Sequence, residues 1–353
     1  MMTISLYALL GLVLGMAMMI VMRALAPHLG LVDAPGGRKT HGEEVPLVGG
    51  VAIFLALCGS MVFMPTIPDE RAWFVIAGGI LVGMGVLDDR YPIRASFRIL
   101  GQVGATLIMV FGAGLVIRSI GNPFFFGEIT TGMLAVPFTV LVAVTVINAF
   151  NLTDGMDGLA ASLSLISLLP FLVLVVIAGR WPQVRFMAAL IGVITAFLLF
   201  NFPASWNRGA RTFMGDAGST FLGLAMVWVG LSISQGEGAL VSPVAGLWFI
   251  AIPVHDLLAS AVRRARKRQA FWTADLGHAH HIFLRAGFTP LQALLFILAV
   301  ASVYCLIGLS GPLLGIPDGI LFTLWVLAGI GHIWLVRRAW VFSKILEIMR
   351  TEL

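Results

Sequence analysis

The sequence predicts an all-α protein of about eleven transmembrane helices, and three observations lead to that fold class. The chain has 353 residues, of which 59% are hydrophobic and only 11% are charged, whereas soluble domains carry about a quarter charged residues. Apolar runs of about 17–22 residues recur along the chain, each long enough to cross a bilayer. Turn-forming residues, chiefly Gly and Pro, separate these runs. We therefore expect a single integral-membrane domain over residues 1–353.

The expected spans follow in order from the apolar runs. Turn signals such as Gly121-Asn122-Pro123 and Trp181-Pro182 mark the breaks between them. The first run has no basic segment before it and no evident cleavage site, so we expect an uncleaved span there rather than a signal peptide. The eleven expected spans are 3–24, 47–65, 72–87, 97–118, 133–150, 158–178, 184–202, 217–234, 241–262, 291–310 and 319–336.

Basic residues divide the connecting loops into two unequal faces. With eleven spans, all but four of the 22 Lys and Arg residues fall on one face or in the C-terminal tail. Cytoplasmic loops carry such an excess, so we expect this face in the cytoplasm, the N-terminus outside and the C-terminus inside. The same excess explains the pI of about 9.8 without a nucleic-acid partner. Residues 337–353 place apolar side chains at helical spacing, which predicts an amphipathic cytoplasmic tail helix.

Five polar clusters lie on the expected cytoplasmic face or at the span ends there. The most informative is the stretch 148–160, which holds two amides and two carboxylates between two apolar runs. An Asp costs roughly 2.5–3.5 kcal/mol at the centre of a membrane helix, so acids near the membrane usually have a function. Because all five clusters share one face, we expect one site. The clusters occupy residues 38–50, 88–90, 148–160, 213–219 and 278–281.

The residue types in these clusters indicate phosphoryl chemistry with a metal. Mg²⁺ prefers one or two carboxylates together with phosphate oxygens, and His and Arg suit the phosphates themselves. Phosphoryl transfer depends mainly on positioning and on neutralising charge, which these residues provide. The sequence contains no Walker A, HExxH or GxSxG pattern, so P-loop hydrolases, zincins and serine hydrolases have no support.

Each cluster also has a purely structural explanation. The pair Asp88-Asp89 can mark a solvated helix end. Asp216 can cap the span that follows it by accepting backbone N–H bonds. The basic run at 263–268 is typical of an anchor at the anionic leaflet. Only the occurrence of all five clusters on one face favours function over these explanations.

A transporter with a polar cytoplasmic vestibule is the alternative class of protein. Transporter sites usually lie near the bilayer midplane on broken helices. Most acids here stand at span ends, which favours an enzyme. The pair His255-Asp256, inside the ninth expected span, has no assigned role.

Taken together, the motifs resemble those of the polyprenyl-phosphate N-acetylhexosamine-1-phosphate transferases. These integral membrane enzymes move a sugar-1-phosphate from a UDP-sugar to a lipid phosphate and release UMP. The resemblance runs from about Arg38 to Gly287. The HAHH form and the eleven-span layout are more similar to the undecaprenyl-phosphate GlcNAc-1-phosphate transferase branch than to the branch that uses UDP-MurNAc-pentapeptide. The motifs, in order, are RKTH…PLVGG, GVLDDR, NAFNLTDGMDGLA, FMGDAGS and HAHHIFLRAG.

The resemblance implies roles for residues in these motifs. It implies a Mg²⁺ cofactor, with Mn²⁺ as an alternative, and metal ligands at Asp216 and Asp154. The catalytic positions it implies are Asp88, Asp89, His278, His280 and His281, with Asp88 as a candidate base. The substrate-binding positions are Lys39, His41, Asn148, Asn151, Asp154, Asp157, Asn201 and Phe213, the last as a stacking partner for uracil.

The implied partners are a UDP-sugar and a polyprenyl phosphate in a bacterial cytoplasmic membrane, with a homodimer left open. Direct attack by the lipid phosphate is favoured, because a phosphate monoester with a second pKa near ~6 is already ionised at neutral pH. A covalent intermediate on Asp88 or Asp89 remains the alternative. Relatives often carry a third acid where this chain has Pro92. That difference leaves another UDP-N-acetylhexosamine or UDP-MurNAc-pentapeptide open as the donor.

Overall fold

The computed structural model of the protein describes residues 2–33, 44–65, 68–203, 211–269, 278–338 and 344. Over these residues the regular structure is helical except for one antiparallel pair of two-residue strands. The elements are α1 Met2–Leu29, β1 Val32–Asp33, β2 Val45–Pro46, α2 Gly49–Val62, α3 Pro68–Arg90, α4 Ala95–Ala113, η1 Gly132–Leu134, α5 Ala135–Thr153, α6 Leu159–Ile177, α7 Trp181–Asn201, α8 Gly215–Ser234, α9 Pro243–Phe249, α10 Ala251–Arg266, α11 Ala279–Arg285, α12 Pro290–Leu314 and α13 Asp318–Arg337.

The predicted all-α polytopic membrane fold is confirmed. Among the described residues, nine helices are long and apolar enough to cross a membrane, or ten if α9 and α10 form one span. The second expected span is shorter than its apolar run. Its helix, α2, has 14 residues, which gives a length of about 21 Å, against a hydrocarbon core of about 30 Å. The count of eleven spans and the orientation therefore remain predictions, and most of the expected tail helix at 337–353 lies outside the described residues.

The ninth expected span is not the continuous helix that the sequence predicted. It is broken at Ile250, where α9 and α10 meet at an angle of 84°. Pro253 stands three residues after the break and has no N–H to donate, so the carbonyl of Phe249 loses its helical partner. The hydroxyl of Ser167 donates to that carbonyl at 2.6 Å. A side-chain hydroxyl thus satisfies the backbone at the bend, as a break inside a membrane requires.

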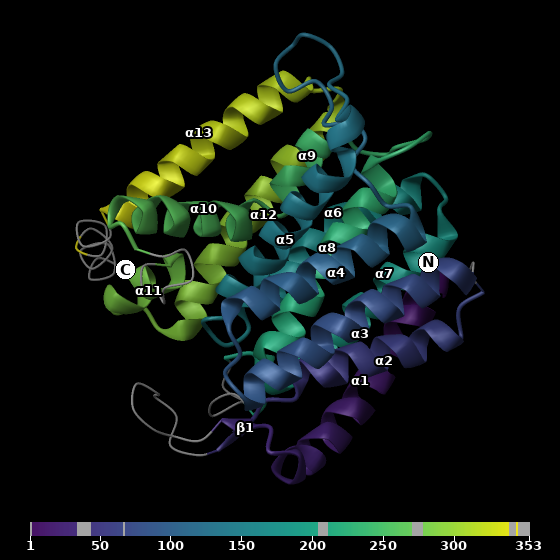
Figure 1. Ribbon diagram of the computed structural model, residues 1–353, viewed down its shortest axis with the longest axis vertical. Helices are drawn as coiled ribbons and strands as arrows, with labels where there is room; N and C mark the ends of the chain where they lie inside the picture. The colour runs from purple at the N-terminus through teal and green to yellow at the C-terminus, as the bar shows by residue number, and fades with distance from the viewer. Residues whose placement is uncertain are drawn as a thin grey trace.

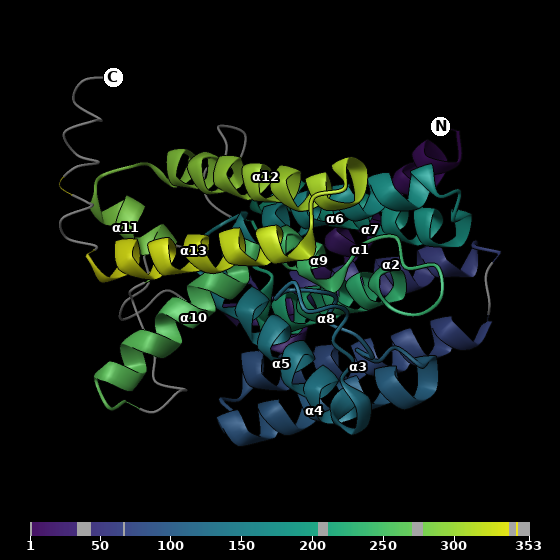
Figure 2. The same ribbon diagram turned by 90° about the horizontal axis from the view of Figure 1, so that it is seen from above.

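Helix α8 lies at the centre of the bundle. Most of it is buried, and α2, α3, α5 and α6 pack around it. Figure 2 shows α8 in the interior, with α3 and α4 toward one side of the bundle and α12 and α13 toward the other. In Figure 1, the neighbouring helices α3, α4 and α5 run alongside one another in front of it. Because α8 begins at Gly215, its first turn places Asp216 near the end of α3, the start of α4 and the end of α5.

The close approach of α3 to α8 depends on Gly85. A Cβ built on Gly85 would lie 2.2 Å from the backbone N and Cα of Ala217, so any side chain there would push the two helices apart. Small residues at such contacts let membrane helices approach backbone to backbone. We expect Gly85→Ala to destabilise the protein by about 1–3 kcal/mol and to lower turnover at least tenfold. Thermal unfolding in detergent and a turnover assay measure these effects.

Gly83 on the same helix provides the matched control. A Cβ at Gly83 would meet no atom within 4 Å, so Gly83→Ala should behave like the wild-type protein. Because alanine forms helix more readily than glycine, helix propensity alone would give no loss in either variant. Equal losses in the two variants would show that the contact with α8 is not responsible.

Candidate active site

Backbone hydrogen bonds join the FMGDAGS motif, just before α8 begins, to the PLVGG segment of the first motif. The N–H of Phe213 donates to the carbonyl of Pro46 at 2.8 Å, and the N–H of Gly49 donates to the carbonyl of Phe213 at 2.9 Å. Gly50 N–H also donates to the carbonyl of Met214 at 2.9 Å. The two segments are thus paired through their backbones, and the PLVGG segment fixes the position of the chain just before Asp216. Phe213 itself is half-buried there, and its predicted stacking on uracil remains a prediction.

Asp89 supplies the cap of α8 from a different helix. Its carboxylate accepts the N–H of Asp216 at 2.9 Å and the N–H of Ala217 at 3.4 Å. Free N–H groups at a helix N-terminus favour a negative group in this position. The sequence left open whether Asp216 capped its own helix. In the structure Asp89 fills that role, which leaves the side chain of Asp216 available for other contacts.

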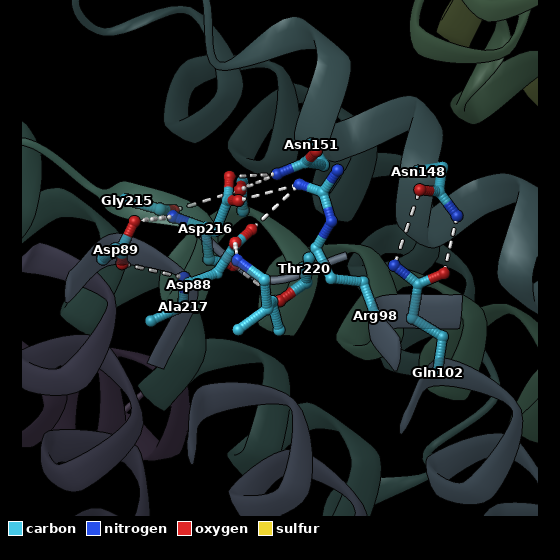
Figure 3. Close-up of polar contacts among 12 residues, drawn as sticks. Asp88, Asp89, Arg98, Gln102, Asn148, Asn151, Gly215, Asp216, Ala217 and Thr220 are labelled. Carbon is cyan, nitrogen blue, oxygen red and sulfur yellow. Dashed lines mark hydrogen bonds and ion pairs between the residues drawn. The ribbon is translucent and has the colours of Figure 1, made fainter. Parts of the chain in front are cut away.

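Arg98 of α4 joins the two other carboxylates of the acid cluster (Asp88, Asp89 and Asp216). Its Nη1 lies 2.9 Å from Asp88 Oδ2 and 3.3 Å from Asp216 Oδ2, and Figure 3 shows it reaching between them. The second oxygen of Asp88 accepts the N–H of Ile93 at 2.9 Å. The paired acids of the GVLDDR motif therefore differ in what they contact. Asp88 faces Arg98 and Asp216, whereas Asp89 accepts the backbone N–H groups at the start of α8.

The two amides of the third motif extend the cluster along α5. Asn151 Nδ2 donates to Asp216 Oδ1 at 2.7 Å and lies 2.9 Å from Ser219 Oγ. One turn earlier, Asn148 Nδ2 donates to Gln102 Oε1 at 2.6 Å, as Figure 3 shows. Asn151 thus orients the Asp216 carboxylate, while Asn148 and Gln102 form a polar pair beside it.

The loop 154–158, which connects α5 and α6, lies between the acid cluster and the histidine motif. A Cβ built on Gly155 would lie 2.5 Å from His280 Nε2, so only glycine lets this histidine approach the loop. Burial is the main cause that lowers the pKa of His280 to about 3, and its imidazole is therefore neutral at pH 7. Asn201 fixes the end of the loop: its Oδ1 accepts the N–H of Gly158 at 2.7 Å. Its amide also donates to Thr212 at 2.9 Å, so both of its polar atoms are engaged within the protein.

Asp154 carries a strongly perturbed carboxyl in this loop. Burial, the largest cause, raises its pKa well above the ordinary value of 3.8, and the nearby acids Asp216, Asp89 and Asp157 raise it further. The folded protein therefore retains a proton that the unfolded chain loses above pH 3.8. Stability must fall as the pH rises from that value toward the folded-state pKa.

This perturbation predicts that Asp154→Asn stabilises the protein when no divalent cation is present. Because asparagine has no proton to lose, the variant should unfold at a higher temperature than the wild type at pH 8 in EDTA. The difference should shrink as the pH falls to about 3, where most of the wild-type carboxyl is protonated in both states. Thermal unfolding in detergent across this pH range measures it. A variant midpoint equal to or below that of the wild type at pH 8 would contradict the expected charge repulsion.

The histidine motif meets an acid from α10 that the sequence left without a role. His278 Nδ1 lies 2.8 Å from Asp256 Oδ2, and both side chains are buried. The rings of His280 and His281 lie with centroids 4.2 Å apart. The three histidines thus form one group, and this group adjoins the 154–158 loop through His280.

A cavity of about 310 Å³ opens beside the acid cluster. Apolar side chains of α3, α4 and α5 line most of it, among them Leu81, Ile99 and Val144. Asp88, Arg98 and Asp216 lie at its polar part, together with Arg264 of α10, which is 6% exposed. The cavity therefore combines an apolar wall with charged groups of both signs.

Some predicted positions lie outside this assembly, and some of its members were not predicted. Lys39 and His41 fall outside the described residues. Arg98, Arg264 and Gln102 were missed as site residues, since sequence reasoning counted the arginines only as loop charges that set topology. The sequence carries no signal that separates Arg98 from Arg90 and Arg94, which closely precede it in the chain.

The acids fit a Mg²⁺ ion whose remaining ligands would come from water and substrate phosphate oxygens. Among the described residues, no group of three or more His, Cys, Asp or Glu side chains is arranged to hold a metal. Mg²⁺ commonly takes only one or two carboxylates and draws its other ligands from water and phosphate. Asp216, with Asp88 beside it and Asp154 nearby, provides such a set.

Comparison with known proteins places the chain in a family. The family model described as Glycosyl transferase family 4 matches residues 72–234. The Yersinia pestis protein named undecaprenyl-phosphate alpha-N-acetylglucosaminyl 1-phosphate transferase is 36% identical, over 94% of this chain and 91% of that protein. The chain belongs to glycosyl transferase family 4. Proteins of the same name from Escherichia coli strain K12 and Haemophilus influenzae are each 32% identical over 94% of this chain, and over 90% and 94% of their own lengths.

The part of the chain matched by the glycosyl transferase family 4 model contains the acid cluster, Arg98 and the 154–158 loop. The histidine motif at 278–281 lies beyond that range. The matches to the relatives extend over 94% of the chain. The unmatched share is too small for the ends of a match to exclude residues 278–281. The structure brings both parts of this family 4 protein together at one end of α8.

Proposed function

We propose that this protein transfers GlcNAc-1-phosphate from a UDP-N-acetylhexosamine to undecaprenyl phosphate and releases UMP. The relatives that match nearly the whole chain carry names with this lipid and this sugar phosphate. The observation that carries the proposal is the cavity in which an apolar wall ends at Asp88, Arg98 and Asp216. A lipid phosphate needs such a wall for its chain and such a cation for its phosphate.

The lipid substrate is placed in the cavity by its chemistry. Its prenyl chain would lie against the apolar side chains of α3, α4 and α5, such as Met84, Ile99 and Leu141. Its phosphate would reach Arg98, whose guanidinium suits phosphate oxygens. Arg264, also in the cavity lining, supplies a second cation at the same end.

The nucleotide donor would lie against the loop 154–158 and the histidine motif. Asn201 holds the end of this loop by accepting the N–H of Gly158, and Gly155 lets His280 approach the loop closely. Because His280 is neutral at pH 7, it would contact the donor's phosphates as a hydrogen-bonding group rather than as a cation. Lipid and donor would then meet at Asp216.

The residues favour direct attack of the lipid phosphate on the donor. Both oxygens of Asp88 are engaged, one by Ile93 N–H and one by Arg98, which suits a positioning role. A bound Mg²⁺, held by Asp216 with Asp88 or Asp154, would neutralise the charge on the donor's diphosphate. Arg98 would hold the attacking phosphate, and Asn151 would keep the Asp216 carboxylate oriented. A covalent aspartyl intermediate remains the alternative.

The proposal includes the membrane topology. We infer eleven spans, with α2 and the bent pair α9–α10 completing the nine long helices. The acid cluster would face the cytoplasm of a bacterial inner membrane, where nucleotide sugars are found. Cysteines placed at Arg94 and Glu237, near opposite ends of the bundle, should react with membrane-impermeant reagents from opposite sides. Labelling of both from the same side would contradict this topology.

A substrate panel tests the function. Purified protein is incubated with undecaprenyl phosphate, Mg²⁺ and one UDP-sugar at a time, and UMP is measured. We expect release with UDP-GlcNAc that requires both the lipid and the cation. Faster release with UDP-GalNAc or UDP-MurNAc-pentapeptide would reassign the sugar. Movement of substrate across vesicle membranes without any UMP would support a transporter instead.

A further inference from the structure

A buried carboxylate outside the acid cluster connects the histidine motif to α13. Asp256 of α10 has a side chain that is 4% exposed. Its Oδ2 lies 2.8 Å from His278 Nδ1, and its Oδ1 accepts the N–H of Ala279 at 3.1 Å. The same Oδ1 lies 3.3 Å from Nε2 of His332, which projects from α13. Three separate segments of the chain therefore meet at one carboxylate.

This arrangement determines which nitrogen of His278 faces the site. A carboxylate that accepts from Nδ1–H fixes the tautomer of an imidazole and the orientation of its ring. The other nitrogen, Nε2, is then the one that can contact a substrate. The ring of His278 stacks parallel to that of His280, with an interplanar angle of 3° and centroids 5.9 Å apart. His280 in turn lies against Gly155 of the loop 154–158.

We propose that Asp256 is a positioning residue for the transfer reaction, which acts by fixing the tautomer and orientation of His278. His332 holds Asp256 from the side of α13, so the last described helix forms part of the catalytic apparatus. The inference rests on the proposed function in one respect, namely that the histidine motif contacts the donor's phosphates. Asp256 itself touches neither the acid cluster's Arg98 nor any substrate in this scheme.

The test compares Asp256→Asn in two backgrounds. Asparagine keeps the shape of the side chain and removes its charge. Outer-shell carboxylates of this kind typically contribute 10–100-fold to activity, and we expect a loss of that size in kcat with an unchanged KM for undecaprenyl phosphate. In a His278→Asn background the same substitution should cost less than threefold, because Asp256 acts through His278. Multiplicative losses in the double variant, or an Asp256→Asn variant as active as the wild type, would overturn the proposal.

Two further variants separate positioning from folding. His255→Phe is the matched control. His255 adjoins Asp256 in the sequence, and its ring centroid lies 4.5 Å from that of Trp325 on α13. His255 has no part in the proposed positioning of His278. The variant should retain wild-type turnover. His332→Phe keeps an aromatic ring but removes one of the three contacts to Asp256, and it should lower kcat about threefold to tenfold, again only when His278 is present. It serves as the second test if Asp256→Asn accumulates poorly.

A spectroscopic measurement tests the positioning role without turnover. The ¹⁵N shifts of His278 at pH 8 should report an Nδ1-protonated ring in the wild type and a mixture of tautomers in Asp256→Asn. The same spectrum in both proteins would overturn the proposal, even if both released UMP. An Asp256-dependent spectrum in a protein that releases no UMP would support the positioning contact and overturn the proposed function.

Discussion

Asp216→Asn is expected to lower UMP release by about 10³-fold while the protein still folds and inserts. Loss of a charged group at the reacting centre typically has effects of this order. Asp216 is the carboxylate on which the other contacts converge, since it meets Arg98 and Asn151 at the half-buried start of α8. Asparagine keeps one acceptor oxygen, enough for one of these two donors, and removes the negative charge that would hold a cation.

The controls for this prediction separate loss of chemistry from loss of structure. Glu237→Gln changes an exposed acid just beyond the other end of α8 and should retain full turnover. The amount of Asp216→Asn protein extracted from membranes, and its elution as a single species, should match the wild type. An Asp216→Asn variant with more than a tenth of wild-type activity would remove Asp216 from the site.

Arg98→Ala is expected to lower turnover by about 10²–10³-fold, mainly through a weaker interaction with the lipid phosphate. Arg98 lies between two carboxylates at 2.9 and 3.3 Å, so its removal leaves like charges facing each other inside the bundle. The loss should appear in KM for undecaprenyl phosphate as well as in kcat. Arg98→Lys should be milder, at about tenfold, because an ammonium keeps the charge but cannot bridge two groups with the geometry of a guanidinium.

Arg94 is the matched control for Arg98. It lies one turn earlier, at the exposed start of α4, and its replacement by alanine removes the same charge from the same face of the membrane. Arg94→Ala should keep at least half of the wild-type turnover. Similar losses in Arg94→Ala and Arg98→Ala would mean that the net charge of the loop, and not the bridge between the acids, supports activity.

These two residues also show how far the sequence alone could predict the site. Asp216 was predicted as a site residue from the resemblance of its FMGDAGS motif, and the structure brings it together with Arg98 and Asn151. Arg98 was not predicted, because arginines on this face also set topology, and a sequence gives no means of separating the two uses. The separate contacts of Asp88 and Asp89 could not be predicted for a similar reason: neighbouring residues on a helix point in directions that only the packing of α3 against α8 determines.

The fold was predicted in its class and in the order of its elements. Apolar runs of span length are direct evidence of membrane helices. The bend at Ile250 was missed, although Pro253 stood in the sequence, because a proline in the first turn of a helix is compatible with a straight span that simply starts later. The surroundings of Asp256 include His332, 76 residues away in the sequence. Contacts at such separations follow from tertiary packing, which a single sequence does not display.

The most direct measurement of the central claim is the identity of both products made by the purified protein. Undecaprenyl phosphate, UDP-GlcNAc and Mg²⁺ are supplied together, and the nucleotide and the lipid are analysed by mass spectrometry. We predict that UMP accumulates in equal amount with a lipid that has gained both the sugar and one phosphate, and that Asp216→Asn forms neither. Release of UDP, with a lipid that has gained the sugar alone, would contradict transfer of a sugar phosphate at this site.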